Sequence, residues 1–358
     1  MEYSYFKAPE EAIAAVRERT EFGVYAYGAL PQERFAASIC NWYKKRYDIT
    51  LEPEAVRHSQ GLMTGALWMI LNAYTRPGDK VLIQAPVYHT FSIVIKGAGR
   101  FVESNDLILK DGRYEMDFED LEKKVADPRV RIMLICNPHN PVGRVWTKEE
   151  LIKVAEICKR NNTLLVSDEI HGDIVYGEHK HTPLFSISDE IADNAIVMGS
   201  PSKTFNLACF YSAYVVIKNK ALRDQYNVVY DDYHFDYNYL GIEALMACYN
   251  ECDYYVDQQN EYFWKNINLV RDFLAENMPE VKMIEPEGTY LLWIDFSAWN
   301  MEQEDLMNAF AEAGVRLNSG TNYRECGKGY VRLNVATQTA VLQKGLDCIK
   351  VARDRHMA

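Results

Sequence analysis

The chain has 358 residues, of which 48% are hydrophobic and 25% charged, and its formal net charge is −12 at pH 7. This length predicts two domains, and the composition is that of an ordinary globular protein. The acidic balance, without any run of lysines or arginines, argues against a nucleic-acid partner or an anionic membrane, because both require a basic footprint.

The first residues, MEYSYFKAPEEAIAAVRERTEF, are acidic and lack the apolar core of a signal peptide. No apolar run approaches the roughly 20 residues that a membrane span requires. The protein is therefore expected to be cytoplasmic, with its eight cysteines as free thiols. Only Cys248 and Cys252 lie close together, and without a second ligand pair nearby they predict no metal site.

Short apolar runs alternate with helical patterns over the first two thirds of the chain. Residues 61–75 predict a buried helix, and Thr147 with Glu150 has the spacing of a capping box at the start of a helix over 147–162. Strands are predicted at 80–86, 131–136, 163–168, 195–200 and 212–217. This order predicts an α/β domain whose mostly parallel sheet is covered by helices on both faces.

The pattern changes after about residue 218, where a tyrosine-rich helical stretch begins. Strands at 289–296 and 330–336 and helices at 304–314 and 339–355 then predict a smaller α+β C-terminal domain over 255–358. The large domain would span 51–254, and residues 1–50 would pack on the small domain.

Several polar residues follow the predicted parallel strands, where ligands of open sheets bind. Lys203 is either a solvated loop lysine or a partly desolvated amine with a lowered pKa, which could form a Schiff base. Asp168 is either a helix N-cap or a buried carboxylate paired with a cation such as a pyridinium nitrogen. The two Asn-Pro steps of CNPHNPVGRVWT favour a rigid loop that presents Asn140 as a hydrogen-bond donor.

Four motifs follow one another along the chain: NPHNPVG, SDEIH, SPSK and YVRLN. Asp168 lies 28 residues after Asn140, and Lys203 lies 35 residues after Asp168. This set resembles the fold type I enzymes that use pyridoxal 5′-phosphate (PLP), the class I/II aminotransferase superfamily. More narrowly it resembles the cystathionine β-lyase branch, the MalY/PatB-type C–S lyases, over nearly the whole chain.

The resemblance implies a role for each matching residue. Lys203 would bind PLP covalently and act as the base at the substrate Cα, and Asp168 would keep the pyridine nitrogen protonated, so that the ring is an electron sink. Asn140 would bind the ring oxygen O3′, Tyr88 would stack on the ring, and His171 would lie near both.

The resemblance also implies sites for the cofactor phosphate and for the substrate. The phosphate would be bound by Ser200, by Ser202, and by the backbone N–H groups of Gly61 and Leu62 at a helix start. Tyr27 would reach the phosphate of the partner subunit in a homodimer whose active site lies at the interface. Arg332 would bind the substrate α-carboxylate, although its position also fits a surface cross-strand charge.

The sequence departs from this family pattern in three places. Tyr211 stands where many aminotransferases have a phosphate-binding arginine. The tyrosine-rich segment 230–239 either lines the substrate entrance or packs in an interface. Relatives usually carry a further segment ahead of the residues that open this chain.

Three functions remain open from the sequence. The first is a C–S β-lyase that converts L-cystathionine or a cysteine S-conjugate into pyruvate, ammonia and a thiol. The second is an aminotransferase of an L-amino acid, which uses the same cofactor residues. The third is a weakly active PLP-binding regulatory protein. None of them calls for a bound metal.

Overall fold

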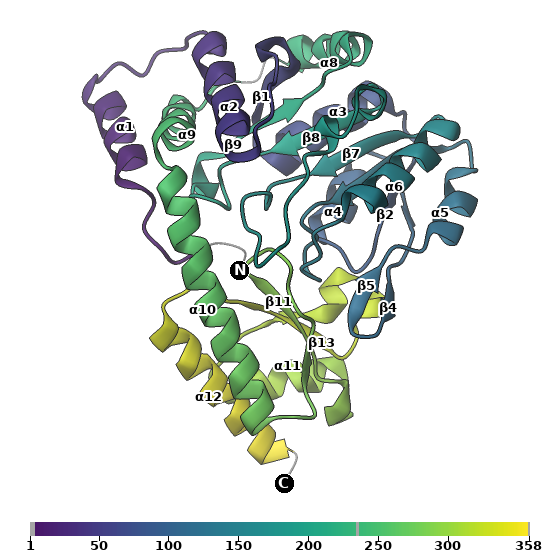
Figure 1. Cartoon of the computed structure of the whole chain (residues 1–358), viewed down its shortest axis with the longest axis vertical. Coiled ribbons are helices and arrows are strands. Elements are labelled where there is room, and N and C mark those ends of the chain that lie inside the picture. The colour runs from purple at the N-terminus through teal and green to yellow at the C-terminus, as the bar shows by residue number, and fades with distance from the viewer. Residues whose placement is uncertain (1–3, 234–235, 357–358) are drawn as a thin grey trace.

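A seven-stranded sheet forms the centre of the larger part of the molecule (Figure 1). The computed structural model describes residues 4–233 and 236–356. The strand order is β1-β9-β8-β7-β6-β2-β3, and β3, β2, β6, β7 and β8 run parallel, whereas β9 is antiparallel to both of its neighbours. The strands are β1 (Val56–Gln60), β2 (Lys80–Ile83), β3 (Phe101–Ser104), β6 (Val130–Cys136), β7 (Leu164–Asp168), β8 (Ala195–Gly199) and β9 (Ser212–Val216).

Both faces of this sheet are buried under helices. Ile132 and Leu134 of β6 belong to the apolar cluster on one face, and Met133 and Ile135 belong to the cluster on the other. This alternation is the period of two expected of a strand. The first face carries α3 (Trp68–Tyr74), α4 (Thr90–Gly97) and α8 (Lys220–Tyr233), and the second carries α2 (Gln32–Tyr47), α5 (Phe118–Val125), α6 (Lys148–Arg160) and α9 (Tyr239–Glu251). The predicted mostly parallel, helix-covered sheet is confirmed.

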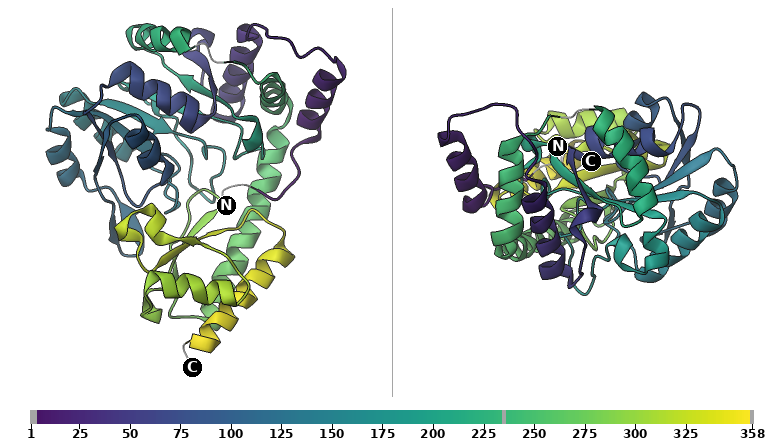
Figure 2. Two further views of the ribbon diagram at one scale, coloured as in Figure 1. Left: turned by 180° about the vertical axis from the view of Figure 1, so that it is seen from behind. Right: turned by 90° about the horizontal axis from the view of Figure 1, so that it is seen from above.

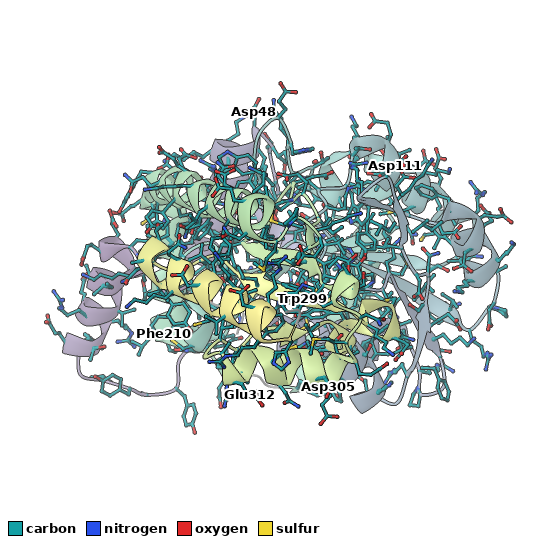
Figure 3. The ribbon with its side chains drawn as sticks, turned by 90° about the horizontal axis from the view of Figure 1, so that it is seen from below. Asp48, Asp111, Phe210, Trp299, Asp305 and Glu312 are labelled. Atoms are coloured by element: carbon teal, nitrogen blue, oxygen red, sulfur yellow. The ribbon has the colours of Figure 1, made fainter. Side chains whose placement is uncertain are left out.

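A four-stranded antiparallel sheet forms the centre of the smaller part of the molecule, in the order β10-β11-β13-β12. Its strands are β10 (Lys282–Met283), β11 (Leu291–Asp295), β12 (Asn318–Ser319) and β13 (Tyr330–Asn334), and its helices are α10 (Asp253–Asn277), α11 (Gln303–Glu312) and α12 (Thr339–His356). The long helix α10 runs from the large sheet to the small one (Figure 1). Viewed from below, α11 places Asp305 and Glu312 at the outer surface (Figure 3).

The N-terminal segment contacts both parts of the molecule. Helices α1 (Glu10–Glu21) and α2 pack against α9, whereas the Tyr5 N–H donates to the Ala336 carbonyl at 2.8 Å and the Phe6 ring meets the Tyr262 ring edge-on. In the view from above, α1 lies at the outer edge of the molecule (Figure 2). The division at residues 50 and 254 stays a prediction.

Local signals located the central strands and the C-terminal helices, but helices α1, α2, α4 and α5 were not predicted. The capping box of α6 is present, since the Glu150 N–H donates to Thr147 Oγ1 at 3.2 Å and the Thr147 N–H donates to Glu150 Oε2 at 2.8 Å. The helix predicted over 61–75 begins as a π-helix, η2 (Leu62–Leu67), before α3. The strand predicted over 80–86 ends at Ile83. Strands β1 and β3 and the hairpin of β4 (Ile108–Lys110) and β5 (Arg113–Glu115) were not predicted.

Short helical turns complete the chain: η1 (Pro53–Ala55), η3 (Leu184–Ser186), α7 (Asp189–Ala192), η4 (Ala208–Phe210), η5 (Ser297–Trp299), η6 (Gly320–Tyr323) and η7 (Glu325–Gly327). Among the helices within 4–233 and 236–356, none is long and apolar enough to cross a membrane.

Candidate active site

A cavity of about 240 Å³ opens beyond the ends of the parallel strands β6, β7 and β8. This edge of an open parallel sheet is where ligands bind. Nine of the residues predicted from the sequence line the cavity: Gly61, Leu62, Tyr88, Asn140, Asp168, His171, Ser200, Ser202 and Lys203. Motifs that are far apart in the chain therefore meet in one place.

Lys203 lies in the turn after β8 and is partly buried. Burial lowers the pKa of its amine to about 8, and the Asp168 carboxylate opposes this shift. A larger fraction of the amine is therefore neutral near pH 7 than for a solvated lysine, and a neutral amine is the nucleophilic form. The structure thus agrees with the desolvated lysine rather than the solvated one.

Asp168 is the last residue of β7 and is 3% exposed. Burial raises the pKa of this carboxyl to about 7, while the Ile170 N–H, which donates to Oδ1 at 3.1 Å, and the charge of Lys203 oppose the rise. A turn rather than a helix follows Asp168, so it is not a helix N-cap. A carboxylate in this position gains most from a cationic ligand group.

Arg332 reaches the site from the other sheet. It lies on β13, is 1% exposed, and its Nη1 donates to Oδ1 of Asn140 at 3.1 Å. Its guanidinium also lies over the Tyr323 ring, 5.1 Å from the centroid. Burial lowers the pKa of Arg332 to about 9. Arg332 is therefore not a surface cross-strand charge.

Burial shifts the pKa values of two ring side chains that line the cavity, His171 and Tyr88. His171 is 2% exposed, and burial, with the charge of Lys203, lowers its pKa to about 3, so the imidazole is neutral. Its Nδ1 is buried without a hydrogen-bond partner, and its ring meets the Tyr290 ring edge-on at 5.6 Å. Burial raises the pKa of Tyr88, whose phenol is therefore protonated. A buried ring nitrogen without a partner is a place where a ligand group fits.

Hydroxyl and amide groups gather at one end of the cavity. Ser200 Oγ and Ser202 Oγ lie 2.8 Å apart, and Ser200 Oγ also donates to the Ser212 carbonyl at 2.7 Å. The Gly61 N–H donates to the Ser59 carbonyl at 3.1 Å, so one predicted phosphate donor is engaged within the chain. Leu62 is the first residue of η2, whose N-terminal amides face an anion favourably.

Because Gly61 has no side chain, the space beside its backbone stays open to the cavity. Its φ is 82°, and a Cβ there would lie 3.4 Å from both Thr64 Oγ1 and Tyr211 Cδ1, which line the same cavity. The groups around this space are hydroxyls, helix amides and an amine, a set that suits a phosphate. With the buried Asp168 for a pyridine nitrogen, the residues fit PLP.

Tyr27 is not brought to this cavity. It is 93% exposed and lies in a separate hollow with Tyr25 and Tyr239. No described residue of the tyrosine-rich segment 230–239 lines the cavity, and residues 234–235 lie outside the described chain. Tyr230 and Tyr237 instead line a hollow beside Arg57.

Sequence reasoning missed several residues of the site. Thr64, Thr90, Cys136 and Tyr211 also line the cavity. Tyr211 had one signal, since it replaces the arginine expected eight residues after Lys203. Thr64 follows the predicted helix start by three residues, which places it beside the phosphate donors. Within the described residues no three His, Cys, Asp or Glu side chains gather as a metal site, and all eight cysteines are free thiols.

The sequence model of the family aminotransferase class I and II matches residues 2–349. The chain belongs to this family. It is 38% identical to cystathionine beta-lyase PatB of Bacillus subtilis (strain 168) over 349 residues, which cover 97% of this chain and 90% of that protein. The resemblance predicted from the motifs is confirmed.

Two solved structures share the fold of this chain, each with a TM-score of 0.95. One is a PLP-bound putative aminotransferase of Clostridium difficile 630, with 37% identity and coverage of 98% of this chain and 91% of that chain. The other is cystalysin of Treponema denticola, which contains a PLP cofactor, with 33% identity and coverage of 99% and 90%. These similarities confirm the predicted PLP-dependent transferase-like fold.

Proposed function

We propose that this protein is a PLP-dependent C–S β-lyase. It would convert L-cystathionine or a cysteine S-conjugate, with one water, into pyruvate, ammonia and a thiol. The observation that carries the PLP chemistry is the cavity lined by the partly desolvated Lys203 amine, the buried Asp168 carboxylate and Asn140, to which Arg332 donates a hydrogen bond from the other sheet. The similarity to a protein named cystathionine beta-lyase PatB supports the lyase reaction.

The chain's own residues would hold the cofactor in a fixed orientation. Bound PLP would supply an electron sink for the electron pair left when the substrate Cα–H bond breaks. Asp168 would pair with the pyridine nitrogen, and Asn140 and His171 would bind the ring oxygen. Tyr88 would lie against the ring face. The hydroxyls of Ser200 and Ser202 and the backbone N–H of Leu62 would bind the phosphate, whereas the Gly61 N–H donates to the Ser59 carbonyl.

Lys203 and Arg332 would act on the substrate. Arg332 would bind the α-carboxylate through its guanidinium and so fix the position of Cα. The Lys203 amine, in its neutral form, would accept the Cα proton. The Cβ–S bond then breaks, the sulfur leaves as a thiolate that takes up a proton, and water completes the release of pyruvate and ammonia.

An aminotransferase is the second candidate, and the family and the neighbour titled putative aminotransferase favour it. It would start with the same proton removal, so the residues of the cavity do not separate the two reactions.

The test is to mix the PLP-loaded protein with L-cystathionine without a keto acid and to follow pyruvate and thiol together. Equal catalytic amounts of both support the lyase. A single conversion of the cofactor without pyruvate supports the aminotransferase, and near-absent turnover on a panel of amino acids supports the regulatory protein.

A homodimer is part of this proposal. Exposed aromatic residues follow α1, with Phe22, Tyr25 and Tyr27 exposed by 67%, 70% and 93%. Such a patch is typical of an interaction surface. Tyr27 would then approach the partner subunit's cavity. Light scattering of the active protein tests this, and a monomer that turns over substrate contradicts it.

A cytoplasmic location is likewise an expectation, which cell fractionation tests.

A further inference from the structure

The three residues after Lys203 are each tied to a different part of the protein. Thr204 Oγ1 donates to Oδ2 of Asp173 at 2.9 Å. Phe205 is fully buried, and its ring meets the Trp42 ring edge-on at 5.6 Å. Asn206 Nδ2 donates to the Phe6 carbonyl at 2.8 Å. The turn that carries Lys203 is closed by backbone hydrogen bonds from the Phe205 N–H to the Pro201 carbonyl at 2.8 Å and from the Leu207 N–H to the Ser202 carbonyl at 3.2 Å. The three side chains then join this turn to other elements of the protein.

Asp173 collects hydrogen bonds from several elements. Besides Thr204, Tyr47 donates to Oδ1 at 2.7 Å, and Trp42 Nε1 donates to the same oxygen at 3.2 Å. The Asp173 carbonyl accepts from Asn260 Nδ2 at 2.8 Å. Trp42 and Tyr47 lie on α2 and Asn260 on α10, so one residue in the turn after β7 links two helices and the Lys203 turn.

We propose that Asp173 is a positioning residue for Lys203 and acts through the Thr204 hydroxyl. The amine of Lys203 is partly desolvated, and its long side chain would gain hydration by turning toward water. Thr204 is 1% exposed and is bonded to Lys203 through the backbone. Its charge-assisted hydrogen bond to Asp173 therefore fixes the Lys203 Cα and directs the side chain into the cavity. This inference rests on the proposed binding of PLP at Lys203 and not on which reaction follows.

The alternative is that the Asp173 contacts only stabilise the fold. Tyr47 offers a matched control, because it donates to the other oxygen of the same carboxylate but is remote from Lys203 in the chain. Burial and the Asp173 charge raise the pKa of Tyr47, which keeps it a donor. Thr204→Val and Tyr47→Phe each remove one hydrogen bond to Asp173, and Thr204→Ser retains the hydroxyl.

The experiment compares these three variants with the wild-type full chain. It measures the melting temperature without PLP, the PLP dissociation constant, and the pH at which the visible absorbance of bound PLP titrates. We expect Thr204→Val to weaken PLP binding about tenfold and to move that pH, and Thr204→Ser to stay within about twofold of wild type. Tyr47→Phe should lower the melting temperature like Thr204→Val but leave PLP binding and the titration unchanged.

Equal effects of Thr204→Val and Tyr47→Phe on PLP binding, or none from either, overturn the inference. A wild-type protein that binds PLP at Lys203 but releases no pyruvate contradicts the lyase function and leaves this inference standing if the variants differ as expected. A wild-type protein that binds no PLP contradicts both.

Discussion

The Arg332 guanidinium donates to Oδ1 of Asn140 at 3.1 Å, although the two residues lie 192 positions apart. Arg332 belongs to the four-stranded sheet, and Asn140 follows β6 of the seven-stranded sheet. The contact joins the two parts of the molecule beside the cavity. The contact uses the carbonyl oxygen of the Asn140 side chain, and the Nδ2 group is the only hydrogen-bond donor of this amide.

The first prediction concerns Arg332→Lys. A lysine cannot form the planar two-point pair with a carboxylate, so kcat/KM should fall about ten- to a hundredfold. PLP affinity should hardly change, because Arg332 would contact the substrate. Steady-state kinetics and a PLP titration measure the two effects. Arg129→Lys, at an exposed arginine, is the control, and an unchanged kcat/KM in Arg332→Lys would rule out the carboxylate role.

The second prediction concerns Lys203→Ala. Without the amine, activity should fall by about 10²- to 10⁴-fold or more, and the visible absorbance of covalently bound PLP should disappear. The fold should survive, because the variant removes a partly desolvated amine. Circular dichroism and absorbance spectra check this, with Lys218→Ala on the surface as the control. Retained activity would contradict the role of Lys203 as the residue that binds PLP and accepts the Cα proton.

The third prediction is that Asp168→Asn lowers kcat more than it weakens PLP binding. The neutral amide cannot keep the pyridine nitrogen protonated, and this charge matters most when the electron pair develops. We expect kcat to fall about 10²-fold. Parallel measurement of kcat and the PLP dissociation constant decides the matter, and equal losses in both would count against the role.

The fourth prediction is a pH dependence of the PLP-free protein. Burial raises the pKa of Asp168 to about 7 from an ordinary 3.8, so the folded state favours the neutral carboxyl. The ionised form therefore costs stability, and the cost grows as the pH rises from 3.8 to 7. For Lys203 the pKa falls from 10.5 to about 8, so its charge costs stability below pH 8 and ceases to do so above 10.5.

Asp168→Asn should accordingly raise the melting temperature of the PLP-free protein at pH 8 and change it little near pH 4. Bound PLP should abolish the gain, because the wild-type carboxylate then has a cationic partner. Differential scanning calorimetry at both pH values, with and without PLP, measures this. A pH-independent difference in melting temperature would contradict the buried, ionised Asp168.

The fifth prediction uses two glycines with similar φ angles. Gly61 has φ 82° and Gly112 has φ 80°, but only a Cβ at Gly61 would approach cavity residues, since nothing lies within 4 Å of a Cβ at Gly112. Gly112→Ala should lose about 1 kcal/mol of stability through its positive φ. Gly61→Ala should lose about 1–3 kcal/mol, because φ 82° with ψ 157° is a combination that essentially only glycine adopts. Only Gly61→Ala should weaken PLP binding, and equal PLP affinities in the two variants would contradict the phosphate position.

The elements that sequence predicted well are those with local causes. The capping box of α6 needs only Thr147 and Glu150, and the strands β6, β7 and β8 are short apolar runs between helical patterns. The strand β1 was missed because VRHSQ is largely polar, although its residues pair with β9. The antiparallel direction of β9 has no local signature, since a buried strand reads alike in either direction.

The sequence by itself predicted nine of the residues that line the cavity. Lys203, Asp168 and Asn140 follow strands that end at one edge of a parallel sheet, and this topology brings them together. Tertiary structure alone decided that Arg332 meets Asn140, that Thr204 meets Asp173, and that Tyr27 lies outside the cavity. The reason is physical: hydrophobic periodicity and capping act over a few residues, whereas contacts between distant segments depend on how the two sheets and their helices pack.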